Sequence, residues 1–202
     1  MIFKALKRLS FYLLFINIIL SNDRLRLKRA NILENKTISN KSVKLISGNV
    51  IFTKGSLTLN CQEGRHYEKD DLAILYRNVT AFQKGRTLVC DTLKFFSKED
   101  KLLSIGNPHV WDKDYDLKSD SLTIFTKNDS GVALGNVTLI QKGQTINANK
   151  IEYIKDINNN GVSYIASGNV IIKDSSRTAN CGKATYNRKN EITTLEIDPQ
   201  IF

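Results

Sequence analysis

Few residues in this chain have the types and spacing that catalysis or metal binding requires. There are only three cysteines (Cys61, Cys90 and Cys181) and two histidines (His66 and His109). Neither histidine has a cysteine or carboxylate at a repeating metal-ligand spacing, so no zinc pattern is present. The chain also lacks a Gly-x-Ser-x-Gly motif and a phosphate-cradling glycine loop. We therefore predict no metal, no cofactor and no enzymatic activity.

The densest group of carboxylates is formed by Asp112, Asp114 and Asp116. This segment lacks the glycine and the terminal glutamate of a calcium-binding loop. Because the three carboxylates alternate along an expected strand and turn, we interpret them as solvent-facing. Trp111, the only tryptophan, precedes them and is expected to point outward, either as a contact residue or as a packing residue at the rim.

The elements that position these residues come from an internal repeat. The best copies of its opening motif are Gly48-Asn49-Val50, Gly135-Asn136-Val137 and Gly168-Asn169-Val170, and degenerate copies are Arg77-Asn78-Val79 and Gly106-Asn107-Pro108. A sixth copy begins at residue 197, so the starts are separated by 29, 29, 29, 33 and 29 residues. A constant period in this range indicates an array of repeated structural units.

Within each unit apolar residues alternate, which is the pattern of a strand with one buried face. The positions 2, 4, 11 and 18 residues after each start are predicted to face the interior. The predicted interior residues are Val50, Phe52, Leu59, Val79, Leu88, Phe95, Val110, Leu117, Ile124, Val137, Leu139, Ile146, Tyr153, Val170 and Ile172.

A further apolar column lies three residues before each start, and it contains Leu45, Ile74, Leu103, Val132 and Ile165. Its separation from the next apolar column is an odd number of residues. We therefore expect a bulge or corner at Gly-Asn that returns this column to the interior. A second corner is expected about 15 residues after each start, and the Lys-Gly pairs at 54–55, 84–85 and 142–143 are expected to be exposed turns.

The cysteines fit the repeat without any redox role. All three lie 13 residues after a unit start, where the other units have Ser119 and Ala148, so this column requires a small inward residue. A disulfide between Cys61 and Cys90 in neighbouring layers remains an alternative at this stage.

These patterns predict an all-β fold in which bent antiparallel β-hairpins stack and bury a continuous apolar interior. Antiparallel pairing is favoured because the alternation leaves one face solvated. A β-sandwich of irregular strands would account for the strands but not for the constant period.

Charge is concentrated at the N-terminus. The chain has a net charge of +10, of which residues 1–44 carry +8 (ten Lys/Arg against Asp23 and Glu34), so residues 45–202 carry only +2. This distribution argues against nucleic-acid binding. Basic residues followed by the apolar run Leu9 to Leu20 predict that residues 1–21 are a signal peptide or a short membrane anchor. We expect residues 22–42 to be a polar linker and residues 43–202 to be the repeat domain.

The combination of an export-like N-terminus with these repeats resembles the OstA family of lipopolysaccharide-transport proteins, which includes LptA, LptC and the N-terminal domain of LptD. The clearest similarity lies in the units from Gly135-Asn136-Val137 to Tyr153 and from Gly168-Asn169-Val170 to Tyr186. The likeness covers about residues 43–202. Arg77 and Pro108 depart from the family pattern.

The resemblance implies an OstA-type β-jellyroll that holds the acyl chains of lipopolysaccharide between two facing sheets, with the interior residues named above as the lipid-binding side chains. It implies a periplasmic location, a role in outer-membrane assembly, and partners that are other jellyroll proteins joined by edge-strand addition, including head-to-tail copies of this chain. The alternatives are a non-catalytic structural β-repeat protein of the cell envelope and the N-terminal part of an LptD-like protein.

Overall fold

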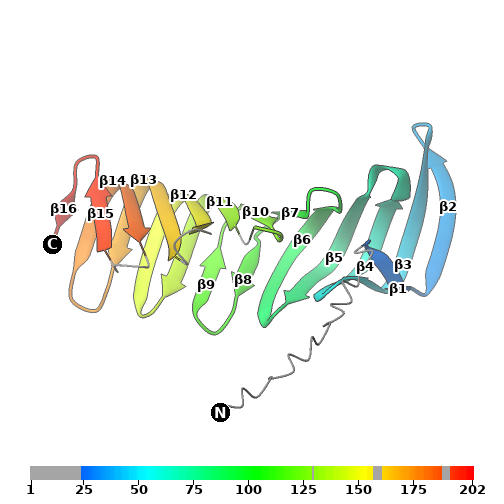
Figure 1. Ribbon diagram of the computed structural model, residues 1–202, viewed down its shortest axis with the longest axis horizontal. Coiled ribbons are helices and arrows are strands. Elements are labelled where there is room, and N and C mark those ends of the chain that lie inside the picture. The colour runs from blue at the N-terminus through cyan, green and yellow to red at the C-terminus, as the bar shows by residue number, and fades with distance from the viewer. Residues whose placement is uncertain (1–23, 129, 157–160, 188–191) are drawn as a thin grey trace, which may run out of the picture.

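The computed structural model describes residues 24–128, 130–156, 161–187 and 192–202. The strands follow one another along the long axis of an elongated molecule (Figure 1). All the strand pairs described are antiparallel and belong to one 16-stranded sheet. The predicted all-β fold of antiparallel hairpins is therefore confirmed. In the part of the chain that the structure describes, no helix has the length and apolar character to cross a membrane.

The first strands run over Arg26–Arg29 (β1), Ile32–Ile38 (β2), Lys41–Lys54 (β3), Leu57–Tyr67 (β4), Leu72–Gln83 (β5), Arg86–Phe96 (β6), Lys101–Ile105 (β7) and His109–Trp111 (β8), with a 3-10 helix η1 at Glu68–Asp70. The remaining strands run over Tyr115–Lys118 (β9), Ser121–Phe125 (β10), Ser130–Gln141 (β11), Gln144–Asp156 (β12), Gly161–Lys173 (β13), Thr178–Asn187 (β14), Ile192–Glu196 (β15) and Gln200–Ile201 (β16).

The Gly-Asn motif forms a corner in the middle of the long strands. The register of the β11–β12 pair shifts between Leu134 and Val137, and equivalent shifts occur in the β3–β4, β5–β6 and β13–β14 pairs. Gly135 and Asn136 both have positive φ, at 76° and 44°, which a glycine followed by an asparagine tolerates well. The predicted corners are confirmed, as is the second corner, which appears as register shifts between Asn60 and Glu63 and between Asn147 and Lys150.

The corners divide the sheet into two parts that we call wing A and wing B. Wing A contains the residues before each Gly-Asn corner and those after the second corner, together with the strands β2, β7, β10 and β15. Wing B contains the residues between a Gly-Asn corner and the second corner that follows it, together with β1, β8, β9 and β16. The long strands β3–β6 and β11–β14 contribute to both wings. Inward residues of both wings form one hydrophobic cluster, so the wings pack face to face.

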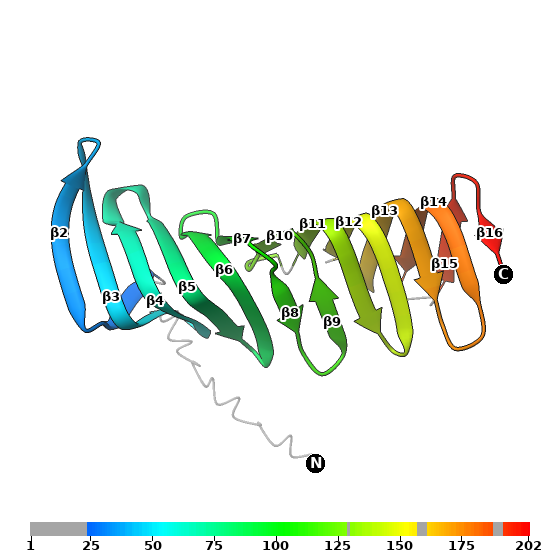
Figure 2. The ribbon, with the colours of Figure 1, turned by 180° about the vertical axis from the view of Figure 1, so that it is seen from behind.

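The long strands are interrupted in the middle of the array, where β7 and β10 lie in wing A and β8 and β9 lie in wing B (Figure 2). This break coincides with Pro108, which replaces the valine of the other copies and has no N–H to donate to a neighbouring strand. The carbonyl oxygen of Pro108 accepts a hydrogen bond of 3.2 Å from the N–H of Ser119.

One predicted apolar column faces the wrong way. The column that contains Leu45, Ile74 and Leu103 is half-buried on the outer surface of wing A, and its members pair with residues such as Arg65 and Lys94. The inward column is the next one along the chain, and it contains Ile46, Leu75, Ser104, Ala133 and Ala166. The residues two before and two after each unit start both point inward, and they are an even number of positions apart. The Gly-Asn corner therefore leaves the alternation of inward and outward residues unchanged, whereas the prediction required it to shift by one residue.

The expected linker is also corrected. Residues 22–42 include β1 and β2, which pair with the two ends of β3, so most of this stretch belongs to the sheet. Leu25 is buried, and the N–H of Asn31 donates to the carbonyl oxygens of Ser47 (3.1 Å) and Gly48 (2.9 Å) between the two strands. The absence of a clear apolar period in the sequence reflects the exposure of most β2 side chains at the end of the sheet. The predicted signal or anchor at residues 1–21 lies outside the described residues.

The small-residue column faces inward as predicted. Cys61, Cys90 and Cys181 are buried, as are Ser119 and Ala148 in the same column. All three cysteines are free thiols, so the disulfide considered between Cys61 and Cys90 is not formed. Burial raises the pKa of the Cys61 and Cys90 thiols to about 11, which makes both thiols poor nucleophiles at neutral pH.

Candidate functional site

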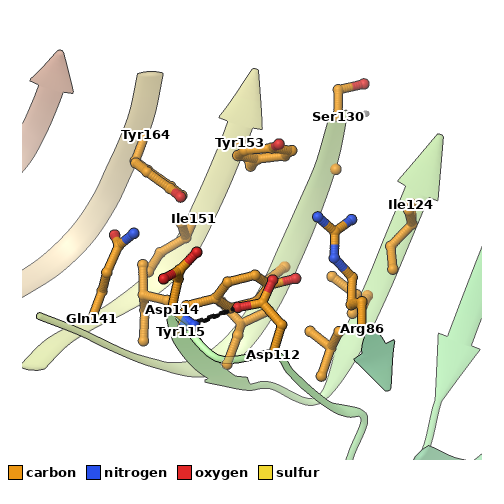
Figure 3. Close-up of a pocket in the computed structure, with 16 residues that line it drawn as sticks. Arg86, Asp112, Asp114, Tyr115, Ile124, Ser130, Gln141, Ile151, Tyr153 and Tyr164 are labelled. Atoms are coloured by element: carbon orange, nitrogen blue, oxygen red, sulfur yellow. Dashed lines mark hydrogen bonds between the residues drawn. The ribbon is translucent and has the colours of Figure 1, made fainter. Parts of the chain in front are cut away.

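Two adjoining cavities lie between the wings in the C-terminal half of the molecule. Their volumes are about 340 and 370 Å³, and both are lined by Leu139, Gln141, Ile151 and Tyr164. We call the combined space the interior slot. Its first cavity is shown in Figure 3. The slot is thus bounded by side chains from both wings, which leave open space between them here.

Small residues on wing A create this space. Ala133 lines the first cavity, and Ala166 and Ala184 line the second. The inward column of Ala133 and Ala166 has Ile46 and Leu75 in the first two repeats, where both side chains are buried. The slot therefore opens where isoleucine and leucine give way to alanine along one column.

The floor of the slot is apolar. Its first cavity is lined by aliphatic side chains from β8, β9 and β11 on wing B and from β10 and β12 on wing A. These aliphatic residues are Val110, Leu117, Leu122, Ile124, Leu139 and Ile151. Such a surface favours an apolar ligand, because each buried methylene group of the ligand contributes roughly 0.8 kcal/mol.

Tyrosines form a second class of lining residue. Tyr153, Tyr164 and Tyr186 are cross-strand neighbours on wing A, with ring centroids 5.5 Å apart for the first pair and 6.2 Å for the second. Tyr115 reaches the slot from wing B, and burial raises the pKa of its phenol, so the side chain is neutral. These rings offer apolar faces together with hydroxyl groups that can hydrogen-bond to oxygen atoms of a ligand.

Charged side chains stand at the rim of the first cavity. Arg86 lies with its guanidinium carbon 5.7 Å from the ring centroid of Tyr115. Asp112 Oδ1 accepts hydrogen bonds from the backbone N–H groups of Asp114 (2.7 Å) and Tyr115 (3.1 Å), which fixes the β8–β9 turn (Figure 3). The expectation that the carboxylates simply face solvent is therefore only partly right, because Asp112 and Asp114 both line the cavity.

Asp116 and the residues near it lie on the outer surface instead. Asp116 Oδ2 is 2.9 Å from His109 Nε2, and the rings of His109 and Trp111 have centroids 4.5 Å apart. Trp111 is half-buried there, as a packing residue of the outer rim. Among the described residues no group of three or more His, Cys, Asp or Glu side chains converges as a metal site.

The predicted interior residues all lie inward, but only some reach the slot. Twelve of them are buried, and Ile124, Ile146 and Tyr153 are half-buried. Those that line the slot are Val110, Leu117, Ile124, Leu139, Ile146, Tyr153 and Ile172. Those that line neither of its cavities are Val50, Phe52, Leu59, Val79, Leu88, Phe95, Val137 and Val170.

Sequence reasoning missed several lining residues, notably Arg86, Tyr115, Ile151 and Tyr164. Ile151 and Tyr164 belong to inward columns, 16 residues after and four residues before a unit start, that hold mixed residue types. The alternation of Ala133 and Gly131 with outward residues on the same strand could have revealed the second of these columns.

In the N-terminal half, side chains from the two wings meet. The ring of Phe52 on wing B contacts the ring of His66 on wing A edge-on, with centroids 5.5 Å apart. Lys54 Nζ lies 5.4 Å from the ring centroid of Phe95 on the opposite wing. Phe52, Leu75, Leu93 and Phe95 are fully buried. Between the wings this half is therefore a packed core. A hollow of about 1020 Å³ in the same half is lined instead by residues at and near the corners, such as Glu63, Arg65 and Arg77.

The part of the chain that contains most of the interior slot is similar to known proteins. Residues 116–200, from β9 to β16, match the model of the family described as LptA/(LptD N-terminal domain) LPS transport protein. This part of the chain is therefore similar to that family. The resemblance to OstA proteins noted in the sequence is thereby confirmed, and the matched residues contain most of the interior slot.

A solved structure supports the same fold. The structure of LptH, described as the LptA homologous periplasmic component of the conserved lipopolysaccharide transport device from Pseudomonas aeruginosa, aligns with a TM-score of 0.52 at 13% sequence identity. The alignment covers 59% of this chain and 98% of that chain, so this array is longer than the LptH fold. A search of curated proteins found no match.

Proposed function

We propose that this protein is a periplasmic lipopolysaccharide-binding carrier or bridge module, and that the interior slot holds the acyl chains of its ligand. The observation that carries the proposal is the coincidence of the slot with the residues matched to the LptA/LptD N-terminal family. An aliphatic floor suits acyl chains. The tyrosine hydroxyls and the polar rim suit the oxygen-rich groups to which such chains are attached.

The two ends of the sheet support a bridging role. At one end β2 is paired with β3 and exposes Ile32 and Leu33, and at the other β15 and β16 are paired with β14 and expose Ile201. Among the described strands, none covers the outer edges of these terminal strands. Such edges can add a strand from another protein, so another jellyroll protein or a second copy of this chain is the partner that we propose.

The same features suit an N-terminal module of an LptD-like protein, because the matched family model includes that domain. In both settings the interior slot would shield acyl chains from water. The basic, apolar N-terminus predicted to direct export supports a location in the periplasm, either free or anchored to the membrane.

Site-specific photocrosslinking in cells that make lipopolysaccharide tests this proposal. A photoreactive residue at Ile146, which lines the slot, should crosslink to lipopolysaccharide. The matched control is Ile140, which lies on a neighbouring strand but is exposed on the outer surface of wing B. We expect little or no lipid adduct there.

Equal labelling at Ile146 and Ile140 would indicate nonspecific contact with lipid. Labelling of protein alone at Ile146, under conditions where a known lipopolysaccharide carrier is labelled by the lipid, would contradict the proposal. It would favour the alternative of a structural β-repeat protein without a lipid ligand.

A further inference from the structure

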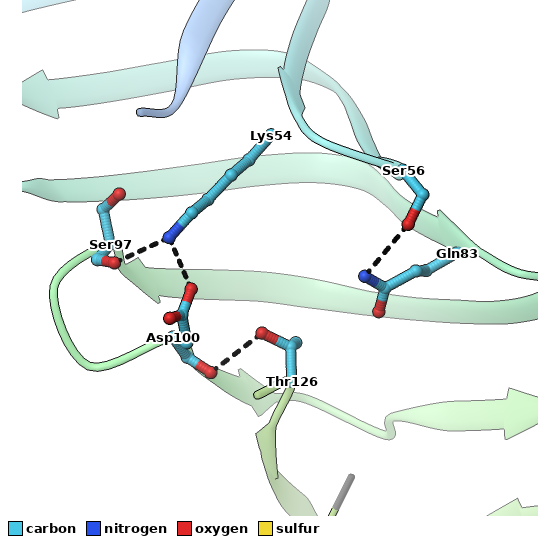
Figure 4. A network of polar contacts seen from close by, with 6 residues as sticks. All are labelled: Lys54, Ser56, Gln83, Ser97, Asp100 and Thr126. Carbon is cyan, nitrogen blue, oxygen red and sulfur yellow. Dashed lines mark hydrogen bonds and ion pairs between the residues drawn. The ribbon is translucent and has the colours of Figure 1, made fainter. Parts of the chain in front are cut away.

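The N-terminal half contains a polar contact that crosses from one wing to the other. Lys54 lies at the end of β3 in wing B, and its Nζ donates to the carbonyl oxygen of Ser97 (2.8 Å) and to Asp100 Oδ1, both in the β6–β7 turn at the edge of wing A. Figure 4 shows Lys54 extended between the two edges. We call this set of contacts the clasp.

The clasp is unusual among the ion pairs of this molecule because it is sheltered. Only 11% of the Lys54 side chain and 29% of the Asp100 side chain are exposed, whereas most other ion pairs described are on the surface. Desolvating two charges is costly unless the geometry is good and further hydrogen bonds satisfy them. Here the ammonium group gains the Ser97 carbonyl as a second acceptor and lies above the Phe95 ring.

The clasp is also tied to the wall of the slot. The carbonyl oxygen of Asp100 accepts hydrogen bonds from the N–H (2.8 Å) and the Oγ1 (3.1 Å) of Thr126. Thr126 directly follows β10, the strand that contributes Leu122 and Ile124 to the first cavity. A ligand that separates the wings at β10 would therefore also move Asp100 away from Lys54.

We propose that Lys54 and Asp100 set the N-terminal limit of the lipid slot. With the clasp formed, the wings stay together over β3–β6 and acyl chains remain in the C-terminal half. With the clasp broken, the wings separate further and acyl chains reach the space around Leu88, which pairs directly with Val110 of the first cavity. This inference rests on the proposed lipid-binding function and adds the residues that determine how much of the array the ligand occupies.

The test uses the full chain in cells, with photoreactive residues at Ile146 in the slot or at Leu88 beyond it, and lipopolysaccharide as the crosslinked ligand. In the unmodified background we expect lipid adducts at Ile146 and few at Leu88. Lys54→Met, which keeps the aliphatic stem but removes the charge, and Asp100→Asn should each raise the adduct at Leu88 several-fold. Lys54→Arg should keep the unmodified pattern because it retains a donor for both acceptors.

Lys84→Met is the matched control, because Lys84 lies in the neighbouring exposed β5–β6 turn on the same edge of wing B. It should leave the Leu88 adduct unchanged. Lipid adducts at Leu88 in the unmodified background as strong as those at Ile146 would overturn the clasp proposal while leaving the lipid-binding function intact. So would Lys54→Met and Asp100→Asn variants that fold, keep the Ile146 adduct and gain none at Leu88.

No adduct at either position in any background would instead overturn the proposed function. If Lys54→Met fails to accumulate, Asp100→Asn alone decides the question, because asparagine has the shape of aspartate without the charge that pairs with Lys54, and the Thr126 contacts involve only the backbone of residue 100.

Discussion

The two halves of this molecule share one repeat and differ in what fills the space between their wings. In the N-terminal half, Phe52 and His66 meet across the interior, and Leu75 and Phe95 are fully buried. In the C-terminal half a row of aromatic contacts runs along wing A, from Tyr153 through Tyr164 to Tyr186, and two cavities lie beneath it. One backbone architecture can therefore support either a packed core or an open interior slot.

The difference follows from a few side-chain volumes. Protein interiors are normally packed without large voids, so cavities of this size need a specific cause. Replacing the Ile46 and Leu75 of early repeats by Ala133 and Ala166 removes three carbon atoms at each position along one inward column. The array would thereby gain stability from its first half and a ligand site from its second half.

The largest expected effect concerns core truncation. Phe52→Ala should reduce the free energy of unfolding by about 3–5 kcal/mol, because it leaves a cavity in a fully buried core. Ile146→Ala should cost about 1 kcal/mol, because this half-buried side chain already lies beside open space. Urea unfolding of both variants measures the difference. Similar losses would mean that the two halves are packed alike.

A second comparison concerns the corners. Gly135→Ala should cost about 1–3 kcal/mol, because φ at this position is +76° and the new Cβ would lie 2.2 Å from Asp120 Oδ2. Arg77 occupies the equivalent corner of the second repeat with φ +61°. Arg77→Gly should stabilise the protein or leave it within about 0.5 kcal/mol, since relief of the left-handed strain offsets the loss of an exposed ion pair with Glu63.

Thermal unfolding of the two corner variants provides the measurement. A marked destabilisation by Arg77→Gly would show that the Arg77 side chain, rather than the backbone geometry, holds that corner.

The smallest expected effect is a pH dependence of the free energy of unfolding, and it arises from one residue of the packed N-terminal half. Burial lowers the pKa of His66 below its ordinary value of about 6.5, an effect that the charge of Lys44 reinforces and those of Glu68 and Asp71 oppose. Because the unfolded chain binds this proton more readily, stability should be full above pH 6.5 and should fall as the pH drops toward the folded-state pKa. The decrease should be complete once the pH is below that value.

His66→Phe introduces the residue that the next repeat has at the same position, Phe95, and provides the control. Unfolding midpoints measured between pH 7 and pH 5 should fall less in this variant than in the unmodified protein. An unchanged pH dependence would assign the effect to groups other than His66.

Much of the fold was predictable because the repeat superposes equivalent positions and so averages out local exceptions. The corners at Gly135 and Gly168 and the small column of Cys61, Cys90 and Cys181 could be placed from spacing alone. Spacing alone could not predict whether the column that contains Leu45 faces inward or outward. The inward direction across a corner depends on the dihedral angles of both corner residues.

The slot was less predictable than the fold. Apolar columns identify which side chains face inward, but whether they meet depends on volumes summed over both wings. The hollow at Ala166 and the contact between Phe52 and His66 depend on two facing columns taken together, and neither column predicts them alone. The role of Lys54 was hidden for the same reason, since its partners Ser97 and Asp100 lie more than one repeat away.

The most direct test of the account is to fill the slot. Ala166→Phe places an aromatic ring in the second cavity, whereas Ser167→Phe places the same ring on the outer surface of wing A, one residue along β13. Lipopolysaccharide that copurifies with each protein from cells is then quantified by mass spectrometry. The account predicts that the Ala166→Phe variant folds but loses most of the bound lipid, while the Ser167→Phe variant retains it. Equal amounts of lipid on both variants would contradict the claim that the C-terminal slot is the binding site.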